Sequence, residues 1–222
     1  MQTSPRPVSV RVRTRRFEIL VTTQVLVLLA YPTLDHERFG FGTQSFVNCA
    51  LMLATLHASL GAGRRFLMGS LLVLLALSAA AWPGDTWHST SNVVSLALQQ
   101  GILAFGGIAI AAEVFRGRRV DRDTLFGAVA IYLLMGFAFA TSYMLLEALA
   151  PGSFAGSEGL DHKGPWADLL FFSFTSLTTT GFGDITPITS RARSLVILQY
   201  TAGVLYIAFV VARLVGLYRS DP

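Results

Sequence analysis

The sequence predicts an all-α membrane protein with six transmembrane helices and one shorter re-entrant helix. Three observations lead to this fold class. The 222 residues are 53% hydrophobic and only 14% charged, whereas soluble domains carry about 25% charged residues. Six apolar segments reach roughly the length that a spanning helix needs. The basic residues gather on one side of the membrane that these segments define.

Short polar loops separate the six predicted spans, which cover residues 17–34, 45–60, 66–82, 92–115, 125–149 and 195–218. The second span is short and contains polar residues, among them Asn48 and His57. A further apolar run at 166–177 is too short to cross a bilayer, so it predicts a re-entrant helix. Pro165 precedes this run, and proline suits the first turn of a helix.

The charged residues predict the orientation of the chain. Residues 1–16 contain five arginines and no acid, and further arginines lie at 64–65 and 116–122 on the same predicted side. Because cytoplasmic loops are enriched in Lys and Arg, both termini are expected in the cytoplasm, at the inner membrane of a cell. The net charge of +4 follows this topology. It therefore does not indicate a nucleic acid, and the expected partner is the lipid bilayer.

The loop between the last two spans contains a polar run, Thr178-Thr179-Thr180-Gly181-Phe182-Gly183-Asp184. Glycines at 181 and 183 allow positive φ angles at alternate positions, which residues with a Cβ resist. Such alternation can turn successive carbonyl groups toward one axis, where they form a site for a dehydrated monovalent cation. Irregular backbone at membrane depth is tolerated where it is buried in protein or lines a water-filled path.

These seven residues resemble the selectivity-filter motif of potassium channels, Thr-Thr-Val-Gly-Tyr-Gly-Asp. The resemblance covers residues 125–218 as outer helix, pore helix, filter and inner helix, and is closest to bacterial six-transmembrane potassium channels of the voltage-gated-like superfamily. It implies a homotetramer around one axis. It also implies that K+, the conducted ion, binds the backbone carbonyls of a set of filter residues: Thr179, Thr180, Gly181 and Phe182, with Gly183 completing the filter.

The resemblance also assigns roles to residues outside the ion sites. Filter support falls to Thr175, Thr178, Asp184 and Phe172, a hinge to Gly203, and the pore lining or gate to Val204, Ile207, Val211 and Val215. The chain differs from the common pattern at several supports. Phe182 and Thr180 replace the commoner Tyr and Val, and Phe171 and Phe172 stand where many relatives have Trp. Because Phe cannot donate a hydrogen bond, Asp184 is expected to face solvent or to pair with Arg191 or Arg193.

The resemblance divides the chain into four parts. These are a basic cytoplasmic tail at 1–16, a four-helix sensor-like bundle at 17–115, a cytoplasmic linker at 116–124 and a pore domain at 125–222. A voltage sensor needs arginines at every third position of a membrane helix, but the fourth span contains no Arg or Lys. We therefore expect a channel that is not strongly voltage-gated. No soluble ligand-binding domain is expected after the last span.

Three alternatives remain at this point. One is a nonselective monovalent cation channel of the same fold, which would share every feature above except the shape of the filter. Another is a subunit that modulates other channels. The run Gly181-Phe182-Gly183-Asp184 also matches the Gly-x-Gly-Asp motif of intramembrane aspartyl proteases. That chemistry needs a second carboxylate facing the first inside the membrane, and Glu113 and Glu147 lie near span ends. We therefore expect no enzyme and no cofactor.

Overall fold

The computed structural model describes residues 15–30, 40–60, 69, 73, 89–116, 122–156 and 166–218. Six long or medium helices and two short strands account for most of these residues. In chain order they are α1 (Arg16–Leu29), α3 (Gly40–Leu60), α5 (Thr90–Arg116), α6 (Arg122–Leu149), β1 (Phe154–Gly156), α7 (Trp166–Leu177), β2 (Ile185–Pro187) and α8 (Ser190–Tyr218). The described part is thus mostly helical, and its one two-stranded sheet was not predicted from the sequence.

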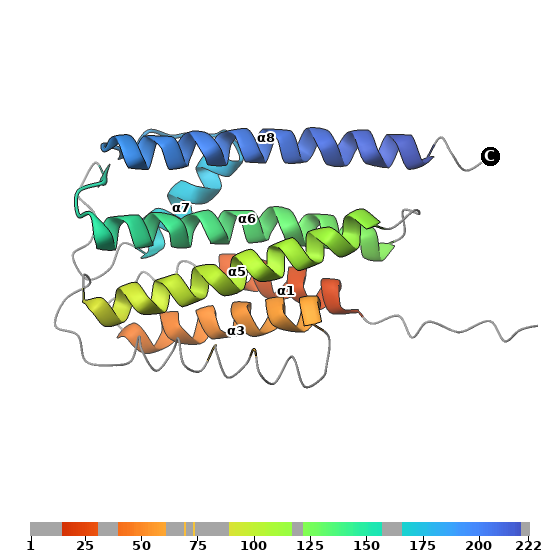
Figure 1. The fold of residues 1–222 in the computed structure, drawn as a ribbon, viewed down its shortest axis with the longest axis horizontal. Helices are drawn as coiled ribbons and strands as arrows, with labels where there is room; N and C mark the ends of the chain where they lie inside the picture. The colour runs from red at the N-terminus through yellow and green to blue at the C-terminus, as the bar shows by residue number, and fades with distance from the viewer. Residues whose placement is uncertain are drawn as a thin grey trace, which may run out of the picture.

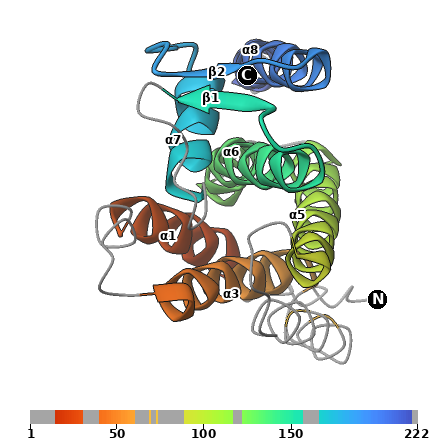
Figure 2. The ribbon, with the colours of Figure 1, turned by 90° about the vertical axis from the view of Figure 1, so that its left-hand side faces the viewer.

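Helix α6 occupies the middle of the arrangement. The end view in Figure 2 shows α7 and α8 on one side of α6, and α1, α3 and α5 on the other. The contacts agree, because α6 packs against α1, α5, α7 and α8, whereas α8 packs against α6, α7 and β2. Figure 1 shows α8 and α6 running alongside each other, with the short α7 next to both. Helix α6 therefore lies between α7 and α8 on one side and the N-terminal helices on the other, and packs against both groups.

Among the described residues, three helices are long and apolar enough to cross a membrane: Thr90–Arg116, Arg122–Leu149 and Ser190–Arg213. The chain is therefore a multi-pass membrane protein. Helix α1 has 14 residues, and the last residues of the first predicted span lie outside the described residues. Apart from Gly69 and Val73, which are helical, so does the predicted third span. Six spans therefore stay a prediction, as do the tail before residue 15 and linker residues 117–121.

The boundaries of two helices differ from the predicted ones. Helix α6 begins at Arg122, so the last residues of the predicted linker are helical. Helix α8 begins at Ser190 rather than at 195 because Thr189 caps it. The Ala192 N–H donates to Thr189 Oγ1 at 3.3 Å, which satisfies an amide that the first turn leaves without a partner. Arg191 and Arg193, predicted in a loop, therefore belong to the first turn of α8.

Candidate functional site

Helix α7 enters beside the C-terminal half of α6 and stops halfway along it. The Phe172 ring lies 5.3 Å from the Tyr143 ring, and the Tyr132 O–H donates to the carbonyl oxygen of Leu177 at 3.2 Å. Residue numbers therefore rise along α7 while they fall along α6, so the two helices are antiparallel. Strand β2 then pairs with β1, which follows the C-terminal end of α6. The segment 178–184 thus leads the chain back from the end of α7 toward the C-terminal end of α6. This path agrees with the predicted re-entrant helix.

The backbone of this segment alternates in conformation. The φ angles of Thr179, Gly181 and Gly183 are 59°, 54° and 82°. Positive φ at the two glycines confirms the prediction made from the motif. Positive φ at Thr179 was not predicted, because a β-branched residue rarely adopts it. With every second residue in the left-handed region, successive carbonyl groups can point the same way.

Backbone amides at the start of the segment donate hydrogen bonds to carbonyl oxygens at the end of α7. The Thr180 N–H donates to the Thr175 carbonyl oxygen at 2.8 Å, and the Gly181 N–H donates to the same atom at 3.3 Å. The Thr178 N–H donates to the carbonyl oxygen of Phe174 at 3.0 Å. In the described part of the chain, no hydrogen bond uses the carbonyl oxygens of residues 179–182. Within the described residues, these oxygens therefore remain available to a ligand.

The threonine side chains also have defined partners. The Thr178 hydroxyl donates to the Phe174 carbonyl oxygen at 2.8 Å and lies 2.9 Å from the Thr180 hydroxyl. The hydroxyl that distinguishes Thr180 from the commoner valine is thus hydrogen-bonded. The Thr175 hydroxyl donates to the Phe172 carbonyl oxygen at 3.0 Å, within its own helix. Thr175 therefore contacts the segment through its main-chain carbonyl and not through its side chain.

Two neighbouring phenylalanines of α7 face different parts of the molecule. The Phe171 ring stacks on the Phe182 ring at a centroid distance of 5.8 Å and an angle of 8°. Phe172 is buried and packs against Tyr143 and Phe154. The aromatic contact between α7 and the filter segment is therefore made by Phe171, whereas Phe172, predicted as a filter support, packs against α6 and β1.

Asp184 is exposed, as expected from the absence of tryptophan at positions 171 and 172 of α7. Among the described residues, no ion pair joins Asp184 to Arg191 or Arg193. Arg193 Nε instead donates to the carbonyl oxygen of Pro187 at 3.2 Å. Of the two predicted environments for Asp184, the structure thus favours solvent.

The sheet holds the chain that leaves the filter segment. Strand β1 pairs with β2 in antiparallel register, from Phe154 opposite Pro187 to Gly156 opposite Ile185. The buried Glu147 carboxylate accepts hydrogen bonds from the Gly152 N–H at 2.7 Å and the Phe154 N–H at 3.1 Å. Sequence reasoning missed Glu147, because a glutamate near a span end resembles an ordinary boundary residue. Its two bonds tie β1, and through it β2, to the end of α6.

A buried network of polar side chains joins α7 to α6 and α8. Tyr143 donates to Gln199 Oε1, and Gln199 Nε2 donates to the carbonyl oxygen of Ser173 at 2.9 Å. Ser173 Oγ donates to the carbonyl oxygen of Gly136 at 2.7 Å. Sequence reasoning missed these residues as well. The signal that could have found them is a glutamine in the apolar helix α8.

Gly203, the predicted hinge, lies close to the end of α7. A Cβ at this position would lie 3.0 Å from both the carbonyl oxygen and the Cδ1 atom of Leu177. The structure thus gives Gly203 a close-packing role, and its role as a hinge stays a prediction.

The predicted pore-lining residues lie on α8 beyond Gly203. About half of the surface of Val204, Ile207 and Val211 is exposed in the structure. Val215 belongs to α8, but its side chain lies outside the described residues. The three described side chains are available to face a pore or other molecules.

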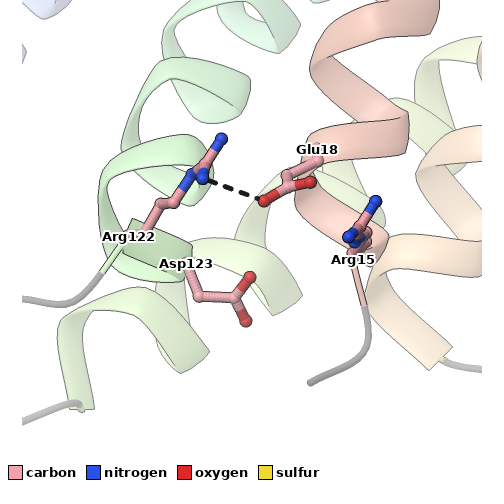
Figure 3. A pocket seen from close by; sticks show the side chains of 4 residues that line it. All are labelled: Arg15, Glu18, Arg122 and Asp123. Atoms are coloured by element: carbon pink, nitrogen blue, oxygen red, sulfur yellow. Dashed lines mark ion pairs between the residues drawn. The ribbon is translucent and has the colours of Figure 1, made fainter. Parts of the chain in front are cut away.

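A polar pocket lies at the opposite end of α6. Figure 3 shows Arg15 and Glu18 at the start of α1 facing Arg122 and Asp123 at the start of α6. The cavity measures about 350 Å³, and Arg122 Nε lies 3.6 Å from Glu18 Oε1. Because its two arginines are matched by two carboxylates, the lining has no net charge. We interpret it as an ion-paired joint between α1 and α6, apart from the filter segment.

Comparison with known proteins finds similarity in the part of the chain that contains the filter segment. Residues 128–220, somewhat under half of the chain, match a family model described as ion channel. A stretch of 65 residues is 40% identical to the protein named two pore potassium channel c from Oryza sativa subsp. japonica. It covers 28% of this chain and only 14% of that relative. No solved structure matches the chain. The region that matches the ion channel model includes the filter segment and α8. The proteins to which the chain is similar are thus channels and not enzymes.

Proposed function

We propose that this chain is the subunit of a homotetrameric potassium channel that conducts K+ passively across the inner membrane of a cell. Four copies of the segment 178–184 surround one axis. K+ passes along the carbonyl oxygens of Thr179, Thr180, Gly181 and Phe182, with Gly183 at the outer end. The observation that carries the proposal is that the backbone amides and the backbone carbonyl groups of this segment have different partners. Amides of this segment bond to α7, and the carbonyl oxygens of residues 179–182 accept no hydrogen bond from the described residues.

Selection of K+ follows from how the ion is held. A cation that enters the filter loses its water, and rings of carbonyl oxygens must replace the hydration shell. The bonds from Thr178, Thr180 and Gly181 to the end of α7 hold the backbone in its alternating conformation. Helix α7 also ends, at Leu177, next to the innermost filter residues. The C-terminal end of a helix carries a partial negative charge, and four such ends favour a cation on the axis.

A single protomer leaves the proposed site incomplete, which supports assembly. Phe182 is 69% exposed, and Leu198, Leu205 and Phe209 on α8 are more than half exposed. Large apolar surfaces of this kind are covered by protein or lipid. In the proposed tetramer, neighbouring copies cover the filter segment and part of α8, and the bilayer covers the rest.

The proposal extends to gating. Helix α5 contains one acidic residue, Glu113, and one basic residue, Arg116, both near its C-terminal end. Glu113 forms an ion pair with Arg16. A helix with so little charge cannot do much work in the membrane field, so the channel is not strongly voltage-gated. Val204, Ile207, Val211 and Val215 line the inner path and close it.

A nonselective cation channel of the same fold is the second candidate. The observation that favours it is the weakly anchored outer part of the filter, where Phe182 makes an aromatic stack with Phe171 and its ring cannot form the hydrogen bond of a tyrosine. The aspartyl protease is disfavoured. The channel-domain match argues against it, and Glu147 already accepts two backbone hydrogen bonds.

A flux assay with the purified chain in liposomes tests the proposal. Liposomes loaded with K+ are diluted into K+-free buffer with a proton ionophore, and a pH-sensitive dye reports the charge-balancing entry of protons. We expect rapid quenching with K+-loaded liposomes and little with Na+-loaded ones. Equal quenching would favour the nonselective channel, and no quenching in either would contradict a channel. Native mass spectrometry of the same sample should show four copies.

A further inference from the structure

Three polar side chains meet in an otherwise apolar region, where α6, α7 and α8 pack against one another. Tyr143, Ser173 and Gln199, here called the Gln199 triad, come from three different helices, and all are fully buried. A buried polar group is costly unless it is hydrogen-bonded, and polar side chains that link membrane helices contribute to specific packing. The proposed ion path uses none of the three side chains, so their presence needs another explanation.

Every donor in the Gln199 triad has an acceptor. The Tyr143 O–H donates to Gln199 Oε1. Gln199 Nε2 donates to the carbonyl oxygen of Ser173 at 2.9 Å and to Ser173 Oγ at 2.8 Å. Ser173 Oγ donates onward to the carbonyl oxygen of Gly136 at 2.7 Å. Because the Ser173 carbonyl can only accept, the Gln199 amide has one workable orientation. The triad therefore specifies one relative position of the three helices.

A second level of contact lies one helical turn further along. Gly203 follows Gln199 on α8 and Leu177 follows Ser173 on α7, in both cases at the i+4 spacing that keeps two residues on one face. Leu177 lies against Gly203, where a Cβ would come within 3.0 Å of its carbonyl oxygen. That oxygen accepts the hydroxyl of Tyr132 at 3.2 Å. Helix α7 is thus fixed at Ser173 and again at its last residue.

The end of α7 in turn holds the filter. The Thr180 and Gly181 amides bond to the Thr175 carbonyl, which lies between the two levels of contact. The ring contact between α7 and the filter, Phe171 on Phe182, is apolar. The polar side-chain anchoring of α7 at Ser173 therefore lies on the side that faces α6 and α8. A displacement of α7 would move the filter backbone with it.

We propose that Gln199 is a positioning residue for the filter. It sets the depth of α7 against α6 and α8, and thereby the spacing of the carbonyl oxygens that distinguish K+ from Na+. This inference rests on the proposed potassium-channel function. It adds a residue outside the ion path as a determinant of selectivity.

Two variants of the whole 222-residue chain and one control test the inference. The measured quantity is the K+/Na+ permeability ratio in planar bilayers. Gln199→Met replaces the amide by an apolar side chain of similar length, and we expect the ratio to fall by about tenfold. Tyr143→Phe removes one hydroxyl but keeps the ring contacts, and we expect a fall of about threefold. Ser142→Ala is the control, because its hydroxyl donates to the Ala138 carbonyl of its own helix, at 2.9 Å, and its ratio should stay at the wild-type value.

The outcomes separate this inference from the proposal on which it rests. Variants that melt earlier but keep the wild-type ratio would show that the triad only stabilises the fold, and would overturn the inference alone. If Gln199→Met fails to assemble, Tyr143→Phe decides in the same way: a lower ratio supports the inference and an unchanged ratio overturns it. A wild-type chain that passes K+ and Na+ equally would instead contradict the potassium-channel function itself.

Discussion

Thr179 adopts a backbone conformation that β-branched residues ordinarily avoid, with a φ of 59°. Such a conformation costs about 1–3 kcal/mol and persists where the surroundings over-determine it. Here the Thr179 N–H bonds to the carbonyl oxygen of Ser176 at 3.0 Å, and the following amide bonds to that of Thr175. Strain held in this way is typical of ligand-binding backbone. It supports the proposal that the Thr179 carbonyl faces an ion.

Glycine at position 183 is required by the backbone and not by space. Its φ is 82°, yet no atom lies within 4 Å of the position that a Cβ would occupy. An L-residue pays about 1–2 kcal/mol in this region of φ, and four copies would bear the cost together. We expect Gly183→Ala to abolish the K+ current in planar bilayers while the chain still assembles.

Gly107→Ala is the matched control for this prediction. Gly107 also has nothing within 4 Å of an added Cβ, but it lies inside α5, where alanine is favoured by about 1 kcal/mol. Its current should match the wild type. A wild-type current from Gly183→Ala would contradict the alternating backbone as the basis of conduction.

The sequence predicts some residues of the site and misses others for a physical reason. Gly181 and Gly183 are recognisable because only glycine adopts positive φ without strain. Positive φ at Thr179 and the partners of Gln199 depend on contacts between segments that come together only in the fold. A pattern of residue types does not contain such contacts. Phe172 shows the same limit, since the sequence placed it beside the filter and the structure packs it against Tyr143.

At the scale of single elements, α8 combines two surfaces with different roles. Its first half contacts α6 and α7 through Val196, Gln199 and Gly203, all of which are buried. Beyond Gly203 most of its described side chains are exposed or only partly buried. The buried residues of the first half fix α8 to the elements that hold the filter. The exposed side chains beyond Gly203 can form a path or contact other molecules and lipid.

Gly203 and Gly216 on α8 provide a test of close packing. An added Cβ at Gly203 would lie 3.0 Å from Leu177, whereas at Gly216 nothing lies within 4 Å. Gly216→Ala should therefore raise the melting temperature in detergent, because alanine favours the helix by about 1 kcal/mol. Gly203→Ala should lower it or leave it unchanged, because overpacking costs about 1–3 kcal/mol. Equal stabilisation by both changes would show that Gly203 is unpacked, as a free hinge would be.

The sequence predicts the long helices well but misses the short strands. Spans α5 and α6 appear close to their predicted positions because long apolar runs are strong signals. The pairing of β1 with β2 was missed, since three-residue strands show no usable alternation. The tie from Glu147 to β1 depends on that pairing. These parts form only when the loop after α6 meets the chain that leaves the filter.

At the scale of the whole molecule, α6 and α8 join the N-terminal helices to the proposed pore. The Arg213 guanidinium lies 5.4 Å from the centre of the Phe115 ring at the end of α5, and Tyr206 donates to the Ala128 carbonyl oxygen on α6 at 2.6 Å. The C-terminal half of α8 is thus in contact with both α5 and α6. Any movement of α8 that closes or opens a path must change these contacts, which gives the N-terminal helices a physical route to influence it.

The central claim is that this chain selects K+ by means of the carbonyl oxygens of residues 179–182. The measurement that tests it most directly is the reversal potential of single channels in planar bilayers, with K+ on one side and an equal concentration of Na+ on the other. The account predicts a reversal potential far from zero, with the sign expected for K+ crossing in preference to Na+. A reversal potential near zero would contradict potassium selectivity, even if the channel conducts.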